Sequence, residues 1–211
     1  MECATLLSVA ASLLLAVPLI LWVSRLWHQP DSLHGGVVII TGGAGGLGCA
    51  LAHEFLRLGA AVELWDVRAA ALDEVCARLR NTPGVSSAAV HARLVDVADA
   101  ESVAAAAKAS IAAHGEPRVV VNNAAVVYGD GVLGGTAQRL QRAIGVNILG
   151  YFWVVRAFVP LLAASRRRCA VVTIGSVMAH LPAARLADYC ASKAAVAQLH
   201  ACLRLELATL P

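Results

Sequence analysis

The sequence predicts an α/β fold, a doubly wound parallel sheet, preceded by an N-terminal transmembrane helix. Three observations support this fold class. Short β-branched apolar runs alternate with helical patterns along most of the 211 residues, which is typical of a parallel sheet with helices on both faces. A glycine-rich string at 41–48 follows the first apolar run and opens a helical pattern, a setting in which glycines approach phosphates. Residues 3–23 carry no charge.

The N-terminal apolar run is long enough to cross a bilayer. As a helix, residues 3–23 would span roughly 30 Å, the thickness of the hydrocarbon layer. Trp22 lies where an aromatic belt is expected, and Arg25 is the first positive charge. We therefore predict a membrane anchor over residues 1–27. A cleaved signal peptide and a buried helix are the alternatives, but the leader carries Glu2 rather than basic residues.

The remaining chain divides into a short linker and one domain. Residues 28–36 are polar and marked by glycine and proline, and the domain is expected over 37–211. The expected strands are 37–41, 61–66, 88–96, 118–122 and 169–176. The expected helices are 46–58, 69–80, 101–114, 137 to about 164, and 186–208.

Charge and cysteine usage exclude several classes of function. The net charge of +3 is too small to indicate nucleic-acid binding, and the basic run 166–168 is expected to be a solvated loop. The six cysteines include no CxxC pair and no metal-ligand spacing, so no metal site is predicted. They are expected to be small buried thiols in a reducing compartment.

The glycine-rich string is expected to bind a dinucleotide pyrophosphate, as in a Rossmann-type domain. It includes Thr41 and Leu47 beside the glycines. Gly42 permits a tight turn, while Gly46 and Gly48 allow the backbone to approach the phosphates closely. Free amides at the start of the following helix then face the phosphate charge.

Two acidic residues that close strands are expected to contact the adenosine half of the cofactor. Asp66 ends the second strand, where a carboxylate accepts hydrogen bonds from ribose hydroxyls and repels a 2′-phosphate. NAD(H) is therefore favoured over NADP(H), and Arg68 is the residue that could reverse this preference. Asp96 closes the third strand beside the expected adenine position, although a turn-capping aspartate is nearly as good an interpretation.

Tyr189 and Lys193 indicate the chemistry. At positions i and i+4 they share one face of a helix, and a nearby ammonium favours the phenolate form of tyrosine. Tyr189 would exchange a proton with an alcohol or carbonyl oxygen while a hydride passes to or from a nicotinamide. Ser176 ends the fifth strand and could hold that same oxygen. His180, close to this serine, is expected to line a pocket or to be exposed.

Together these motifs resemble the short-chain dehydrogenase/reductase superfamily. The residues that carry the resemblance are Thr41-Gly-x-x-x-Gly-Leu-Gly48, Asn122-Asn-Ala-Ala125, Asn147, Ser176 and Tyr189-x-x-x-Lys193. The resemblance implies that Asn123 belongs to the cofactor site. It also implies that Asn147 holds a water that relays protons to Lys193, and that Lys193 binds the nicotinamide ribose. Ala125 departs from the usual glycine of the superfamily.

A narrower resemblance links the chain to the membrane-anchored branch, which contains retinol dehydrogenases, retinal reductases and 17β-hydroxysteroid dehydrogenases. It rests on Leu64-Trp-Asp66, Val146-Asn-Ile-Leu-Gly-Tyr-Phe-Trp153 and Asp188-Tyr-Cys-Ala-Ser-Lys193. It implies a lipophilic retinoid or steroid substrate and a location at the endoplasmic reticulum membrane or lipid droplets. Arg25 set against Glu2 favours a cytoplasmic catalytic domain. An apolar substrate pocket is expected from Val126, Val127, Leu133, Met178 and Leu181, although core packing is an equal interpretation for each.

The resemblance also implies two strands and a substrate lid beyond Pro211. The sequence therefore predicts a domain that lacks its last strands and leaves an apolar, unpaired edge on the sheet. The alternative to an active enzyme is a catalytically silent, truncated isoform that binds cofactor weakly or pairs with a full-length relative. The expected assembly, if one forms, is a homodimer or a heterodimer with a related chain.

Overall fold

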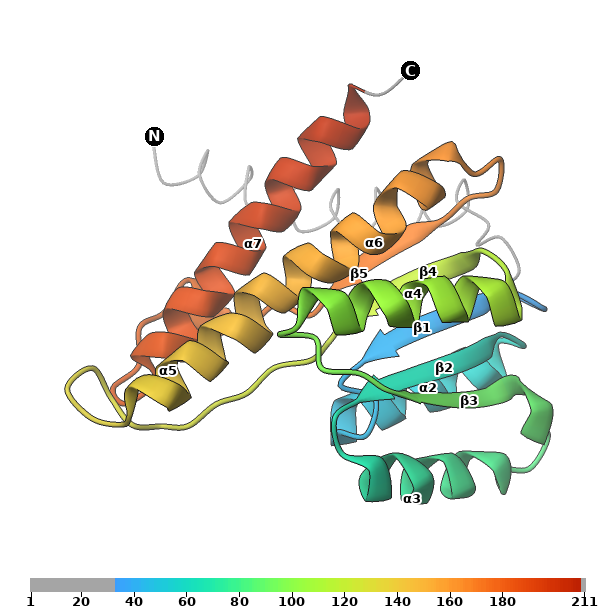
Figure 1. Ribbon diagram of the computed structural model, residues 1–211, viewed down its shortest axis with the longest axis horizontal. Helices are drawn as coiled ribbons and strands as arrows, with labels where there is room; N and C mark the ends of the chain where they lie inside the picture. The colour runs from blue at the N-terminus through green and yellow to red at the C-terminus, as the bar shows by residue number, and fades with distance from the viewer. Residues whose placement is uncertain (1–32, 210–211) are drawn as a thin grey trace, which may run out of the picture. The chain divides into compact units, whose positions relative to one another are not determined.

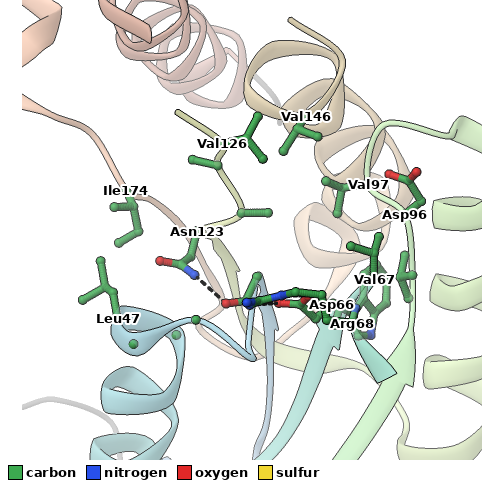
Figure 2. A pocket seen from close by; sticks show the side chains of 18 of the residues that line it. Leu47, Asp66, Val67, Arg68, Asp96, Val97, Asn123, Val126, Val146 and Ile174 are labelled. Atoms are coloured by element: carbon green, nitrogen blue, oxygen red, sulfur yellow. Dashed lines mark hydrogen bonds and ion pairs between the residues drawn. The ribbon is translucent and has the colours of Figure 1, made fainter. Parts of the chain in front are cut away.

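A five-stranded parallel sheet forms the centre of the domain. The computed structural model describes residues 33–209, and the strand order is β3-β2-β1-β4-β5 (Figure 1). The strands are β1 (Val37–Thr41), β2 (Ala61–Asp66), β3 (Val90–Leu94), β4 (Pro117–Asn122) and β5 (Ala170–Thr173). Since neighbouring strands are parallel, their carboxyl ends meet at one edge of the sheet. A cavity opens at that edge (Figure 2).

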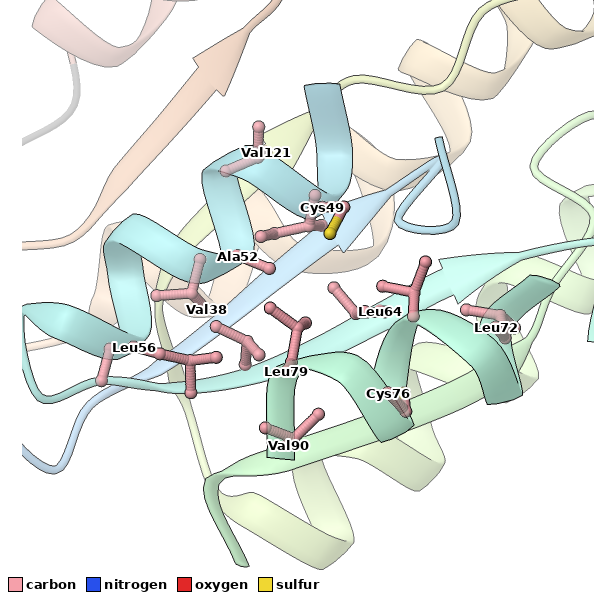
Figure 3. Packing of buried hydrophobic residues seen from close by; sticks show 14 of the residues in the cluster. Val38, Cys49, Ala52, Leu56, Leu64, Leu72, Cys76, Leu79, Val90 and Val121 are labelled. Atoms are coloured by element: carbon pink, nitrogen blue, oxygen red, sulfur yellow. The ribbon is translucent and has the colours of Figure 1, made fainter. Parts of the chain in front are cut away.

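The side chains of the central strand β1 alternate between two hydrophobic clusters, one on each face of the sheet. Val38 and Ile40 contribute to one hydrophobic cluster, with α2 (Gly46–Arg57) and α3 (Ala69–Arg80) packed on it (Figure 3). Val37 and Ile39 contribute to the opposite cluster, which is covered by α4 (Ala100–His114) and α6 (Gly150–Ala164). The predicted doubly wound parallel sheet is confirmed, because a strand buried on both faces needs helices on each side.

Two predicted strands are shorter in the structure. The segment predicted over 88–96 begins with a short 3-10 turn, η1 (Ser87–Ala89), and becomes a strand only at Val90. The fifth strand, predicted over 169–176, ends at Thr173, and the chain then turns into η3 (Val177–Ala179). In both cases one further backbone bond follows the strand, from Val95 to Asp66 and from Ile174 to Asn122, and the chain then leaves the sheet earlier than the periodicity predicted.

The helix predicted from 137 to about 164 is continuous but not uniform. It begins as α5 (Ala137–Ile144), widens into a single π turn, η2 (Gly145–Leu149), and continues as α6. Within the described part of the chain, this stretch, Ala137–Ala164, is long and apolar enough to cross a membrane by length and composition. The α6 part of this stretch packs on β4, β5 and α4.

The sheet ends at β5, which pairs with β4 alone among the described strands. Val172 in its centre is 38% exposed. Within residues 33–209, β5 is thus an edge strand of the sheet. The last helix, α7 (Ala187–Ala208), follows β5 and packs against η3 and η2 (Figure 1).

The regions outside these elements agree with the sequence only in part. The predicted anchor, residues 1–27, lies outside the described residues. The end of the predicted linker, 33–36, forms a turn joined to the domain by the Gly35 amide, which donates to the Gly59 carbonyl at 3.0 Å. The run 166–168 is exposed, as predicted. The expectation of buried thiols is met by Cys49 and Cys76 but is wrong for Cys202, which is exposed on α7.

Candidate active site

The cavity at the carboxyl edge of the sheet has a volume of about 550 Å³. Its walls combine the ends of all five strands with the starts of α2 and α7. Figure 2 shows Leu47 and Ile174 on one side of it and Val97 and Asp96 on the other. Of the predicted cofactor residues, the cavity wall includes Gly42, Gly46, Leu47, Gly48, Asp66, Asp96, Asn123, Tyr189 and Lys193.

The glycine loop is shaped by backbone demands that a side chain would violate. Gly42 has φ of 64°, a left-handed conformation that favours glycine. A Cβ on Gly48 would collide with the Gly42 carbonyl oxygen, so this turn closes only with glycine there. By contrast, a Cβ on Gly46 would meet no protein atom within 4 Å. No side chain caps the start of α2, and its first amides therefore remain available to an anion.

Thr41 has a different role from the one that the sequence suggested. Its side chain is buried, at 1% exposure, and does not border the large cavity. Its hydroxyl donates to the Val121 carbonyl at 3.2 Å and accepts from the amides of Asn123 and Ala124 at 3.0 and 3.1 Å. Thr41 thus joins β1 to the end of β4, below the cofactor loop. The side-chain Nδ2 of Asn123 reinforces this junction by donating to the Thr41 carbonyl at 2.8 Å.

Asp66 reaches the cavity with its carboxylate already occupied. One oxygen accepts from the backbone amide and Nε of Arg68, and the other accepts from the Ala44 amide and a terminal guanidinium nitrogen of Arg68. Burial alone would raise the pKa of this carboxyl, but the Arg68 and Ala44 bonds outweigh it and hold the pKa below its usual value. The Asp66 side chain is 6% exposed, whereas that of Arg68 is 58% exposed.

Asp96 caps a turn, one of its two predicted roles, and it also lines the cavity. One carboxylate oxygen accepts from the Ala98 amide at 2.9 Å, as a turn-capping aspartate does. The other accepts from the Arg142 guanidinium at 2.6 Å, and both residues line the cavity. Sequence reasoning missed Arg142. The signal available in the sequence was that Arg142 lies on the same predicted helix as Asn147, five positions before it.

Tyr189 and Lys193 both line the cavity. The Lys193 Nζ lies 5.7 Å from the centre of the Tyr189 ring and donates to the Ile174 carbonyl at 2.7 Å. Lys193 is 5% exposed, and burial lowers the pKa of its ammonium group. A buried ammonium has three donors, so further acceptors in the cavity are favoured, and a bound ribose would supply them.

Asn147 lies in the π turn and fastens it to the loop after β4. Its amide exchanges two hydrogen bonds with the Val126 backbone, at 2.8 and 3.0 Å, and also donates to Ser192 at 3.1 Å. These bonds explain the wider turn, because the side chain pins one helical residue to a neighbouring segment. Sequence reasoning missed Ser192, although it is adjacent to Lys193.

A second, small cavity of about 20 Å³ separates Asn147 from Lys193. A space of this size accommodates roughly one water molecule. The buried Nδ2 of Asn122, which also borders it, has no hydrogen-bond partner among the described residues. An orphaned buried donor beside a polar, water-sized space fits a bound water, which is the position that a proton relay between Asn147 and Lys193 would require.

Ser176 caps η3 and is not part of the lining of the large cavity. Its Oγ accepts from the Met178 amide at 3.1 Å, which leaves its own proton free to be donated. η3 packs against α7, which carries Tyr189.

His180 is exposed, one of its two predicted states. The prediction that Leu133 lines an apolar pocket is wrong, because its side chain is fully exposed. Val127 and Leu181 do not form such a pocket either, since both are more than half exposed.

The glycine turn and the Tyr189–Lys193 pair therefore line one cavity at the carboxyl edge of a parallel sheet, which is where dinucleotides bind in folds of this class. Comparison with known proteins gives the family. A family model described as short chain dehydrogenase matches residues 36–210, and the chain belongs to this family.

Individual relatives agree with this assignment. The chain is 34% identical over 179 residues to estradiol 17-beta-dehydrogenase 11 of Pongo abelii, which covers 85% of this chain and 58% of that protein. It therefore spans less than two thirds of the curated relative. A metagenomic short-chain oxidoreductase in complex with NADP superimposes with a TM-score of 0.77 at 31% identity, covering 84% of this chain and 78% of the other. A short-chain dehydrogenase from Burkholderia phymatum in complex with NAD superimposes with a TM-score of 0.77 at 31% identity. The match covers 82% of this chain and 60% of the other.

Proposed function

We propose that the protein is a membrane-anchored oxidoreductase that transfers a hydride between NAD(H) and a lipophilic alcohol or carbonyl compound. The observation that carries this proposal is the composition of a single cavity. Its wall contains both the glycine turn, where no side chain caps the start of α2, and the Tyr189–Lys193 pair. A dinucleotide that bridges the two would bring its nicotinamide to the tyrosine.

The residues of the chain supply binding and proton transfer in this reaction. The bound nicotinamide would supply the hydride acceptor or donor. Tyr189 would take the proton from the substrate hydroxyl during oxidation, or give it to the carbonyl oxygen during reduction. The Ser176 hydroxyl would hold that oxygen with its unused proton. The Lys193 ammonium would favour the charged form of the phenol and bind ribose hydroxyls, while Asn147 and a water in the small cavity would connect it to further proton donors.

The preference for NAD over NADP is part of the proposal and rests on Asp66. A carboxylate at this position repels a 2′-phosphate. Arg68 opposes that effect, because its guanidinium neutralises the same carboxylate. We infer that NAD binds more tightly and that Arg68 makes the margin smaller than Asp66 alone would give.

The substrate class and location follow from the relatives and from the N-terminal sequence. The relative named estradiol 17-beta-dehydrogenase 11 points to lipophilic substrates, with steroids and retinoids as the classes to test first. The charge-free run 3–23 would hold the domain at the endoplasmic reticulum membrane or at lipid droplets, where such substrates partition. The catalytic domain is proposed to face the cytoplasm, as a monomer or paired with a related chain.

The test is cofactor turnover by membranes that carry the full chain. Membranes with the wild-type chain and with Tyr189→Phe would be supplied with NAD or NADH and a panel of retinoids and steroids, and absorbance at the nicotinamide band would be followed. We expect turnover with at least one member of the panel, and none with the variant. Cofactor binding without turnover across the whole panel would instead favour the catalytically silent alternative.

A further inference from the structure

Arg185 has an unusual backbone conformation just before the catalytic helix. Its φ of 64° makes it the one non-glycine residue between 33 and 209 with a positive φ. This left-handed conformation is unfavourable for a residue with a Cβ, so surrounding contacts must maintain it. Arg185 lies four residues before Tyr189, in the segment that joins η3 to α7. The strain is therefore located at the approach to the first turn of α7.

The Arg185 side chain and backbone both contact the loop that precedes α5. The guanidinium Nε donates to the Gly129 carbonyl at 3.1 Å. The backbones are close as well, since a Cβ on Gly131 would lie 3.7 Å from the Arg185 Cα. Residue 185 therefore connects two segments that are more than fifty positions apart in the sequence.

Both connected segments lead directly to active-site residues. The loop at 129–135 follows Val126, which lines the cavity and is bound by the Asn147 amide. On the other side, the Cys190 amide donates to the Leu186 carbonyl at 2.7 Å, and Tyr189 lies within this first turn of α7. A displacement of Leu186 would thus move the backbone that carries the phenol.

We propose that Arg185 is a positioning residue for Tyr189. It holds the start of α7 against the 129–135 loop and acts through the backbone, without contacting substrate or cofactor. This inference rests on the proposed function, in which Tyr189 transfers the proton. Arginine suits the position because its planar guanidinium directs Nε at the Gly129 carbonyl, whereas lysine has no donor at that point of its side chain.

The test compares three substitutions of Arg185 with a matched control. Arg185→Ala removes the hydrogen bond, Arg185→Gly removes it but tolerates the positive φ, and Arg185→Lys keeps the charge. The control is Arg166→Ala, which removes another exposed arginine, in the basic run before β5. Two readouts are measured on the full chain: amide hydrogen exchange, and kcat and KM with NAD and the best substrate of the panel.

We expect Arg185→Ala to accelerate exchange in two segments at once, 129–135 and 186–190, while the sheet is unchanged. Its kcat should fall about threefold to tenfold, the effect of one lost hydrogen bond, with the KM for NAD nearly constant. Arg185→Gly should lose less, because the backbone can keep its conformation without strain. Arg185→Lys should fall between the alanine variant and wild type, and Arg166→Ala should behave as wild type.

Three results would overturn the proposal. The first is an Arg185→Ala protein that matches Arg166→Ala in both exchange and kcat. The second is faster exchange in only one of the two segments, which would show that they are not coupled. The third is accelerated exchange throughout the sheet in both the alanine and glycine variants, which would show a general loss of stability. If the wild-type chain shows no turnover, the proposed function fails, and the exchange readout still decides whether Arg185 couples the segments.

Discussion

The Arg68 guanidinium covers both oxygens of the Asp66 carboxylate, with Nε at 3.0 Å from one and a terminal nitrogen at 3.2 Å from the other. Backbone amides of Arg68 and Ala44 fill the remaining acceptor positions. A carboxylate with four donors has no vacant position for ribose hydroxyls. Under the proposed function, we expect the choice between NAD and NADP to depend on how readily the exposed arginine side chain leaves Asp66.

Removal of Arg68 is expected to sharpen the preference for NAD. In Arg68→Ala the carboxylate becomes free to accept from the ribose and repels a 2′-phosphate without opposition, so NADP binding should weaken by about 1–3 kcal/mol. Titration calorimetry with both cofactors measures this. Asp66→Ser is the matched variant, which frees the arginine and should shift binding toward NADP. A wild-type chain that binds NADP more tightly than NAD would show that the Asp66 argument is wrong.

Tyr189→Phe should abolish turnover while cofactor binding stays nearly intact. The substitution removes only the phenolic oxygen, and general acid–base catalysis of this kind contributes about 10²–10⁴-fold. The rate constant of hydride transfer would be followed by nicotinamide absorbance, and NAD affinity by protein fluorescence. Lys193→Ala serves for comparison, because it should impair both turnover and NAD binding. Substantial activity in the phenylalanine variant would contradict the assignment of Tyr189.

The stability of the domain should decrease in mild acid, in part because of His91. Burial lowers the pKa of this imidazole, and the stacked His114 ring, 4.1 Å away, adds to the effect, as do Arg80 and Arg93, while Glu63 opposes it. Since the fold favours the neutral ring, the unfolded chain binds protons first as the pH falls below about 6.5. The contribution of His91 is thus present above that pH and is lost as the pH falls through its lowered pKa.

Thermal unfolding at pH 7.5 and pH 5.5 checks this expectation. The loss of Tm between the two values should be smaller in His91→Gln than in wild type. His180→Gln is the control, because His180 is exposed and faces no such cluster. Equal losses of Tm in wild type and His91→Gln would exclude the imidazole as a source of the pH dependence.

Residues 1–27 are expected to act as an uncleaved membrane anchor, because residues 3–23 carry no charge and the leader is acidic. Carbonate extraction of cell membranes should leave the full-length chain in the pellet, and intact mass should include Met1 or its immediate neighbour. A variant with Leu13 and Leu14 changed to arginine should become extractable. A soluble product shortened near Ser24 would support the signal-peptide alternative.

Local patterns predicted the fold and most of the cavity wall. Short-range spacing, after a strand or along one helix, was enough to identify the glycine turn, Asp66 and the Tyr189–Lys193 pair. Residues that are a few positions apart in the sequence remain neighbours in the folded chain. Contacts between distant segments were not predictable in this way. The Arg142–Asp96 pair and the Ser192 bond to Asn147 join positions 46 and 45 residues apart. Thr41 was misassigned because a threonine beside a phosphate-binding turn looks the same in sequence whether its hydroxyl faces the ligand or the neighbouring strand.

The π turn at Gly145–Leu149 also determines the rotational phase of α6. Each residue of an α-helix advances the chain by about 100° around its axis, so the wider turn sets which side of α6 meets the sheet. The buried stripe Val154, Phe158 and Leu162 faces the sheet because of the rotation about the helix axis that the π turn introduces. A single-residue deletion between 145 and 149 would rotate this stripe by about 100° and expose Phe158, whereas substitutions on the outer face of α6 would leave the phase unchanged. The length of this segment is therefore constrained more tightly than its composition.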